Sequence, residues 1–180
     1  MAPGTANSGS VGSGPTLTER PHEEGNRKAC PMSLPATLPN GFLPPGVHTA
    51  SLQAIIERFG TATPRRQVLA GRLEELLHVA RATGQLQRAF LWGSFPTDAS
   101  FPRDLDLFLL MQVGFDQAFQ HLPPTQRDVF EHDRARLRFE ADVFWATAAI
   151  GMAELTAWLS VYQLSRDMVP RGIVEVIWDD

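Results

Sequence analysis

The sequence contains very little cysteine and lysine, and it has no long run of apolar residues. Cys30 is the single cysteine and Lys28 the single lysine among 180 residues. One cysteine excludes an internal disulfide framework and favours a reducing compartment. No apolar stretch approaches the roughly 20 residues that cross a bilayer, and the first residues lack the apolar core of a signal peptide. We therefore expect a cytoplasmic protein that does not associate with membranes.

Positive charge is also scarce. The formal net charge is −4 and the isoelectric point is near 5.7, so no overall basic field favours nucleic acid as a partner. What the sequence does have is an ordinary apolar fraction of 43%. A chain of this length can bury a substantial core, which predicts one globular domain.

The first part of the chain differs in composition from the rest. Residues 1–38 are rich in Gly, Ser, Pro and Thr and show no periodicity. Such a segment cannot bury enough apolar surface to offset the entropy lost on ordering. We expect residues 1–38 to be a disordered tail and residues 39–180 to form a single domain. Met32, close to the start of that domain, is an alternative start of the native chain.

Residues 39–180 alternate between helical and strand patterns. Apolar residues recur with helical spacing in three segments, and a capping box indicates a fourth: 52–59, 63–82, 151–164 and 125–134. Short apolar or alternating runs predict four strands: 89–92, 104–109, 139–145 and 173–177. This order predicts an α/β or α+β domain, with a mixed β-sheet and flanking helices.

Two acidic residues lie on one face of the second predicted strand. In Asp104-Leu-Asp106 the alternation places both carboxylates on the same side, with Cα atoms about 6.6 Å apart at roughly 3.3 Å per residue. Adjacent carboxylates repel each other unless a cation lies between them. Because hard divalent cations prefer oxygen ligands, the pair predicts an Mg²⁺ or Mn²⁺ site. The alternative is a strand edge whose acids face water.

The first strand ends at Gly93-Ser94, nine residues before the acidic pair. A strand that ends in Gly-Ser and turns into a short helix exposes backbone N–H groups that attract phosphate. Glycine lets the backbone approach a ligand, and the serine hydroxyl adds a donor. Gly93 and Ser94 are therefore candidate phosphate contacts, although a Gly-Ser pair is also common in ordinary turns.

A third carboxylate is expected on the strand 139–145. Glu140 and Asp142 share a face there, and we favour Asp142 because its neighbours are more apolar, so that its charge needs a cation or a hydrogen-bond partner. Arg134, Arg136 and Arg138 precede this strand. They form either a solvated face or, for one of them, a phosphate contact, because arginine matches phosphate bidentately.

A strand, Gly93-Ser94, Asp104-x-Asp106 and a later acid in an apolar strand together resemble the polymerase-β-like nucleotidyltransferase superfamily, in its minimal form. Over residues 40–178 the chain also resembles a little-characterised bacterial family of nucleotidyltransferase-like proteins. The resemblance implies a nucleotidyltransferase-like fold. It implies that Asp104, Asp106 and Asp142 bind two Mg²⁺ ions and that Gly93 and Ser94 bind a nucleoside triphosphate.

The resemblance implies transfer of a nucleoside monophosphate from a triphosphate to an acceptor hydroxyl, with release of pyrophosphate. Minimal relatives often modify a partner protein within a toxin–antitoxin pair, so a protein encoded nearby is the expected acceptor. Two other interpretations stay open. The fold can be retained without metals as a binding module or antitoxin-like subunit, or the acids can be coincidental in a plain α/β domain.

Overall fold

The domain is built on one five-stranded mixed sheet. The computed structural model describes residues 34–178. The strands follow one another along the chain as β1 (Gly46–Ser51), β2 (Leu86–Trp92), β3 (Leu105–Met111), β4 (Ala141–Thr147) and β5 (Gly172–Ile177). Their order across the sheet is β1-β5-β2-β3-β4. The pairs β1–β5 and β3–β4 are parallel, and β2 is antiparallel to both of its neighbours. The predicted α+β class with a mixed sheet is confirmed.

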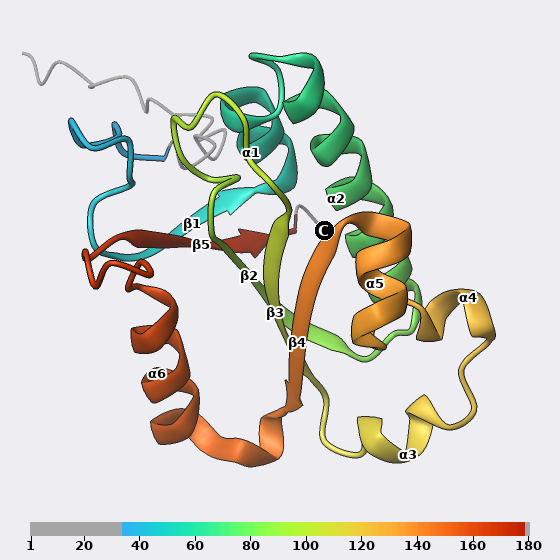
Figure 1. Ribbon diagram of the computed structural model, residues 1–180. Helices are drawn as coiled ribbons and strands as arrows, with labels where there is room; N and C mark the ends of the chain where they lie inside the picture. The colour runs from blue at the N-terminus through green and yellow to red at the C-terminus, as the bar shows by residue number, and fades with distance from the viewer. Residues whose placement is uncertain (1–33, 179–180) are drawn as a thin grey trace, which may run out of the picture.

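Helices cover the two faces of the sheet unequally, as Figure 1 shows. The helices are α1 (Leu52–Phe59), α2 (Pro64–Ala82), α3 (Phe115–Phe119), α4 (Pro124–Arg127), α5 (His132–Phe139) and α6 (Gly151–Tyr162), with a short 3₁₀ turn, η1 (Ala148–Ile150), before α6. The larger apolar core lies under α1, α2 and α5, and a smaller one lies under α6. The face under α6 is therefore only partly covered, which leaves room for a site there.

The predicted helix starts are confirmed at both N-terminal helices. The Ser51 hydroxyl accepts a hydrogen bond from the Ala54 amide at 3.2 Å, and the Thr63 hydroxyl accepts one from the Arg66 amide at 3.2 Å. Pro64 occupies the first position of α2, where it loses no helical hydrogen bond. These local signals are sufficient to position both helices in the sequence.

One strand was not expected, and one expected helix is wrong. The segment 46–51, to which no element was assigned, is the edge strand β1, because it pairs with β5 at the far end of the described chain. The helix expected over 125–134 is replaced by α4 and α5, with the chain bending between them. In both cases tertiary pairing or packing decided the outcome over the local pattern.

Most of the expected tail, residues 1–33, lies outside the described residues. Residues 34–38 do not belong to a separate tail, because they contact the domain. Leu34 is buried, and its carbonyl accepts a hydrogen bond from Arg58 at 3.1 Å. The Thr37 hydroxyl donates to the Asp98 carboxylate. Within the described residues, contacts with the domain therefore extend back to Leu34, beyond the expected boundary at residue 39.

Across residues 34–178, none of the helices combines the length and the apolar character that crossing a bilayer requires.

Candidate functional site

The sheet brings the three predicted carboxylates together on the face that carries α6. Asp106 and Asp142 are direct neighbours across the parallel β3–β4 pair, and Trp92 is the neighbour of Asp106 on the other side. Asp104 immediately precedes β3. Because side chains alternate along a strand, Asp106 shares its face with Phe108, which packs in the core under α6. Residues distant in sequence thus meet at one end of the sheet.

Gly93 makes room for one of these acids. It has a φ of +82°, and a β-carbon added to it would lie 1.7 Å from Oδ2 of Asp106. No other amino acid fits in this position without moving the carboxylate. The glycine predicted to approach a phosphate therefore has a clear second role, which is to let the Asp106 carboxylate lie against the backbone of the turn.

Ser94 closes the turn that follows. Its hydroxyl accepts a hydrogen bond from the Arg103 amide at 3.2 Å, and its carbonyl accepts one from the Thr97 hydroxyl at 2.7 Å. Residues 93–96 form a turn, so the short helix expected after Gly-Ser is absent from this position. The helix-terminus argument for phosphate binding therefore does not apply to this turn.

A buried arginine that the sequence pattern did not indicate holds the same loop in place. Arg66 is 3% exposed. It donates hydrogen bonds to the carbonyls of Phe59 (2.7 Å), Phe95 (2.9 Å), Thr97 (2.6 Å) and Ala99. Burial lowers the pKa of this guanidinium, an effect that the nearby Asp98 charge partly opposes. Arg66 thus fixes the backbone of the loop between β2 and β3 to the start of α2.

The loop between β2 and β3, the acidic pair and the segment between α6 and β5 line a cleft of about 350 Å³. It is lined by Phe42, Gly93, Ser94, Thr97, Ala99, Phe101, Arg103, Asp104, Asp106, Arg166 and Arg171. This set contains two carboxylates and three guanidinium groups. The arginines were not predicted as site residues, because nothing in their local sequence shows that they meet.

The carboxylates carry negative charge that the protein neutralises only in part. Burial, followed by the charges of Asp104 and Asp142, raises the pKa of Asp106 to about 7. Burial and the Asp142 charge also raise the pKa of Asp104. The charge of Arg166 lowers the pKa of both acids, and the charge of Arg171 lowers that of Asp106. Neither cancels the increase. Such a combination of burial and like charge is typical of functional sites.

Asp142 is held differently from the other two. Nε of Arg136 lies 3.2 Å from its Oδ1, and Nε2 of His132 lies 4.0 Å from the same atom. This oxygen is buried and makes no hydrogen bond of acceptable geometry. Glu140, the alternative third acid, lies in the left-handed turn before β4 and pairs with Arg65 (2.5 Å) and Arg72 (3.0 Å) instead. Of the two alternatives, Asp142 is therefore the one near the acidic pair.

The residues fit a divalent cation only in part as they stand. Within residues 34–178, no three His, Cys, Asp or Glu side chains form a ready-made metal site. However, neighbouring cations do not fully compensate the negative charge of Asp104 and Asp106. Asp142 has a buried carboxylate oxygen without a hydrogen bond. Three carboxylates of this kind are the hard oxygen donors that Mg²⁺ prefers. The donor atoms are therefore of the type that Mg²⁺ or Mn²⁺ prefers, but within residues 34–178 they are not arranged as a metal site.

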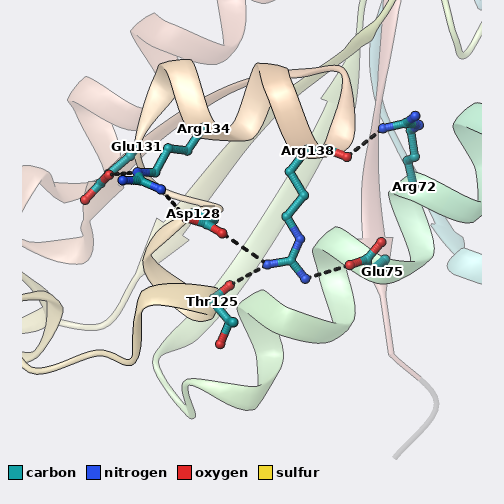
Figure 2. A network of polar contacts seen from close by, with 7 residues as sticks. All are labelled: Arg72, Glu75, Thr125, Asp128, Glu131, Arg134 and Arg138. Atoms are coloured by element: carbon teal, nitrogen blue, oxygen red, sulfur yellow. Dashed lines mark hydrogen bonds and ion pairs between the residues drawn. The ribbon is translucent and has the colours of Figure 1, made fainter.

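The basic cluster before β4 divides between two places. Figure 2 shows Arg138 between Glu75 of α2 and Asp128, at 2.7 and 3.3 Å. Arg134 pairs with Glu131 at 2.9 Å in the same network. Only Arg136 lies beside an acid of the site. Arg134 and Arg138 therefore belong to the surface between α2 and α5, which we call the α2–α5 network.

Comparison with known proteins identifies one family. The profile of a family of unknown function (DUF6932) matches residues 35–177. No curated protein and no solved structure matches the chain.

Proposed function

The chain belongs to the DUF6932 family, whose function is unknown, and we propose from its own site that it is a metal-dependent nucleotidyltransferase. The reaction moves a nucleoside monophosphate from a nucleoside triphosphate to an acceptor hydroxyl. The observation that supports this proposal most directly is the pair Asp104 and Asp106 in one cleft, with the pKa of Asp106 raised to about 7. A site of this kind favours binding of a cation, and a cation favours binding of a polyphosphate.

The residues have distinct proposed roles. Asp104 and Asp106, together with Asp142, would hold Mg²⁺ or Mn²⁺. The cation, when bound, supplies positive charge where negative charge develops on the reacting phosphate. Asp142 accepts the proton of the acceptor hydroxyl, and Arg136 at 3.2 Å orients that carboxylate. Gly93 and Ser94 line the cleft and are proposed to contact the nucleotide there.

The bonds of the reaction balance. The acceptor oxygen forms a bond to the α-phosphorus, and the bond from that phosphorus to the β-phosphate oxygen breaks. Pyrophosphate leaves with the electron pair, and the hydroxyl proton moves to a carboxylate. The cleft volume of about 350 Å³ lies at the lower end of the range for small-molecule sites, about 300–1,000 Å³.

The resemblance to minimal polymerase-β-like nucleotidyltransferases supports the same reading. In that interpretation the sheet of Figure 1 is a nucleotidyltransferase-like fold, and the acceptor is a hydroxyl on a partner protein of a toxin–antitoxin-type pair. The second candidate function is a binding module or antitoxin-like subunit without catalysis. The Arg136–Asp142 ion pair favours it, because an acid that already has a cationic partner needs a metal less.

A transfer assay distinguishes these candidates. The full chain is incubated with Mg²⁺ or Mn²⁺, with each of four nucleoside triphosphates labelled at the α-phosphate, and with the protein encoded beside its gene. We expect label in the acceptor together with release of pyrophosphate. Asp104→Asn should remove both signals, whereas Asp116→Asn, the same change at an exposed position of α3, should leave them unchanged.

Calorimetry provides the second measurement. Binding of metal–nucleotide without transfer to any acceptor would limit the proposal to nucleotide binding. A wild-type protein that neither binds metal–nucleotide at millimolar concentration nor transfers label would overturn the transferase and favour the binding module without metals.

A further inference from the structure

A narrow loop carries two of the cleft arginines. Residues 163–171 connect α6 to β5, and backbone hydrogen bonds fix their course: Arg171 N–H to Gln163 O at 2.8 Å and Ser165 N–H to Val169 O at 2.9 Å. Leu164 and Pro170 pair as an isolated bridge. Arg166 and Arg171 therefore project from a defined structure into the lining of the cleft.

The guanidinium groups of this loop are largely free to bind a ligand. Nε of Arg171 donates to the Tyr162 carbonyl at 3.3 Å, and its two terminal amino groups make no hydrogen bond or ion pair to residues 34–178. The exposed Arg166 side chain has no such partner in the same range. Both groups lie close enough to Asp106 for their charges to act on it. Arg103 also lines the cleft, so guanidinium groups outnumber carboxylates there by three to two.

The Gly93–Ser94 turn is less available to an anion. Oδ2 of Asp106 occupies the space over the α-carbon of Gly93, and a carboxylate there repels a phosphate. The Ser94 hydroxyl accepts the Arg103 amide and keeps one proton to donate, so it offers an anion a single neutral contact. Arginine, in contrast, binds phosphate oxygens bidentately and stays charged at all relevant pH values.

We propose that Arg166 and Arg171 form the main polyphosphate-binding element of this cleft, with Arg103 in the same lining and with the Gly93–Ser94 turn as a weaker contact. This inference rests on the proposed function and specifies how the triphosphate of its substrate is held. Arg171 is the more enclosed of the two and Arg166 lies at the mouth, so a longer phosphate chain contacts both. Tripolyphosphate should accordingly bind more tightly than pyrophosphate, and pyrophosphate more tightly than orthophosphate.

The test measures binding of inorganic tripolyphosphate to the full chain by calorimetry, in EDTA and again with Mg²⁺. Arg166→Gln should weaken binding at least tenfold, and Arg171→Gln at least as much. The matched control Arg134→Gln removes the same charge from the α2–α5 network and should change the affinity less than twofold. Ser94→Ala should weaken binding less than either arginine variant does.

Thermal midpoints are recorded for each variant, so that loss of folding is not mistaken for loss of binding. The exposed Arg166 provides the decisive variant, because its replacement breaks no contact within residues 34–178. Unchanged tripolyphosphate affinity in Arg166→Gln, or a larger loss in Ser94→Ala, would overturn the inference. Nucleotidyl transfer with an unchanged KM for the triphosphate in Arg166→Gln would overturn it and leave the proposed function intact. If tripolyphosphate binding requires Arg166 but no nucleotidyl transfer is found, the inference stands and the proposed function is overturned.

Discussion

The α2–α5 network and the cleft beside Gly93 are both rich in arginine, but they differ in how their charges are matched. In the network, Arg138 contacts two carboxylates and the Thr125 carbonyl, and Arg72 donates to the Arg138 carbonyl at 2.6 Å (Figure 2). In the cleft, Asp106 has no ion-pair partner within 4.0 Å among the described residues, and Arg166 has none either.

This difference separates structural charge from functional charge. Ion pairs at the surface contribute modestly to stability, and both of their charges are already compensated. Unmatched and partly buried charges reduce stability, and a folded protein retains them where a ligand supplies the missing charge. The comparison therefore indicates the cleft, and not the network, as the place where a ligand binds.

The largest expected effect contrasts one acid from each region. Asp106→Asn should reduce nucleotidyl transfer by about 10³-fold or more, because charge stabilisation at a metal-assisted phosphate is worth several kcal/mol. Asp128→Asn, in the network, should retain most of the activity. Rates of label transfer under saturating nucleotide check both variants, and equal losses in the two would remove the functional distinction between the regions.

A smaller effect is expected at the turn that accommodates Asp106. Gly93→Ala should destabilise the protein by about 3 kcal/mol, because the new β-carbon overlaps Oδ2 of Asp106 and the φ of +82° is strained for alanine. Denaturant unfolding measures the change. In an Asp106→Ala background the same substitution should cost less, since only the backbone strain remains. An equal cost in both backgrounds would show that the carboxylate is not what constrains Gly93.

The unmatched charge should also appear in the pH dependence of stability. The pKa of Asp106 is about 7 in the folded protein and 3.8 in the unfolded reference, so the folded state binds the proton more tightly. The resulting stabilisation is complete below pH 4 and disappears as the pH rises through 7. In EDTA, the stability advantage of Asp106→Asn over wild type should grow by about 2–3 kcal/mol between pH 5 and pH 8. Parallel pH profiles for the two proteins would contradict this expectation.

The smallest effect is expected in the matched region. Arg138→Gln should lower the free energy of unfolding by about 1 kcal/mol, and less at high salt, because its ion pairs are partly exposed. Tripolyphosphate affinity and transfer should not change. A variant that loses affinity without losing stability would place the network in the binding site.

The sequence predicted the features that depend on residues close together in the chain, such as helix starts and strand faces. The starts of α1 and α2 follow from local hydrogen bonds to Ser51 and Thr63, and the closeness of the acidic pair follows from strand alternation. It favoured Asp142 over Glu140 only on the apolar character of the neighbours. The left-handed conformation that takes Glu140 out of the strand is held by Arg65 and Arg72 of another helix, and no local pattern shows that.

The groups that sequence reasoning missed all depend on tertiary placement. β1 has only a short apolar pattern and exists because β5 pairs with it. Arg66 looks like any basic residue of a first helical turn, yet it binds four backbone carbonyls from other segments. Arg166 and Arg171 reach the acids across more than 50 residues of sequence. Sequence periodicity does not predict such contacts between distant segments.

The position of β5 has a consequence for how the protein is made. It is the last strand along the described chain, yet it lies inside the sheet between β1 and β2. During synthesis on the ribosome, β1 therefore waits without any hydrogen-bonded neighbour, and β2 with one edge open, until residues 172–177 emerge. The sheet closes in a late step that joins both halves at once. Nascent chains should stay sensitive to protease until that step, and a chaperone that shields open strand edges would act before it.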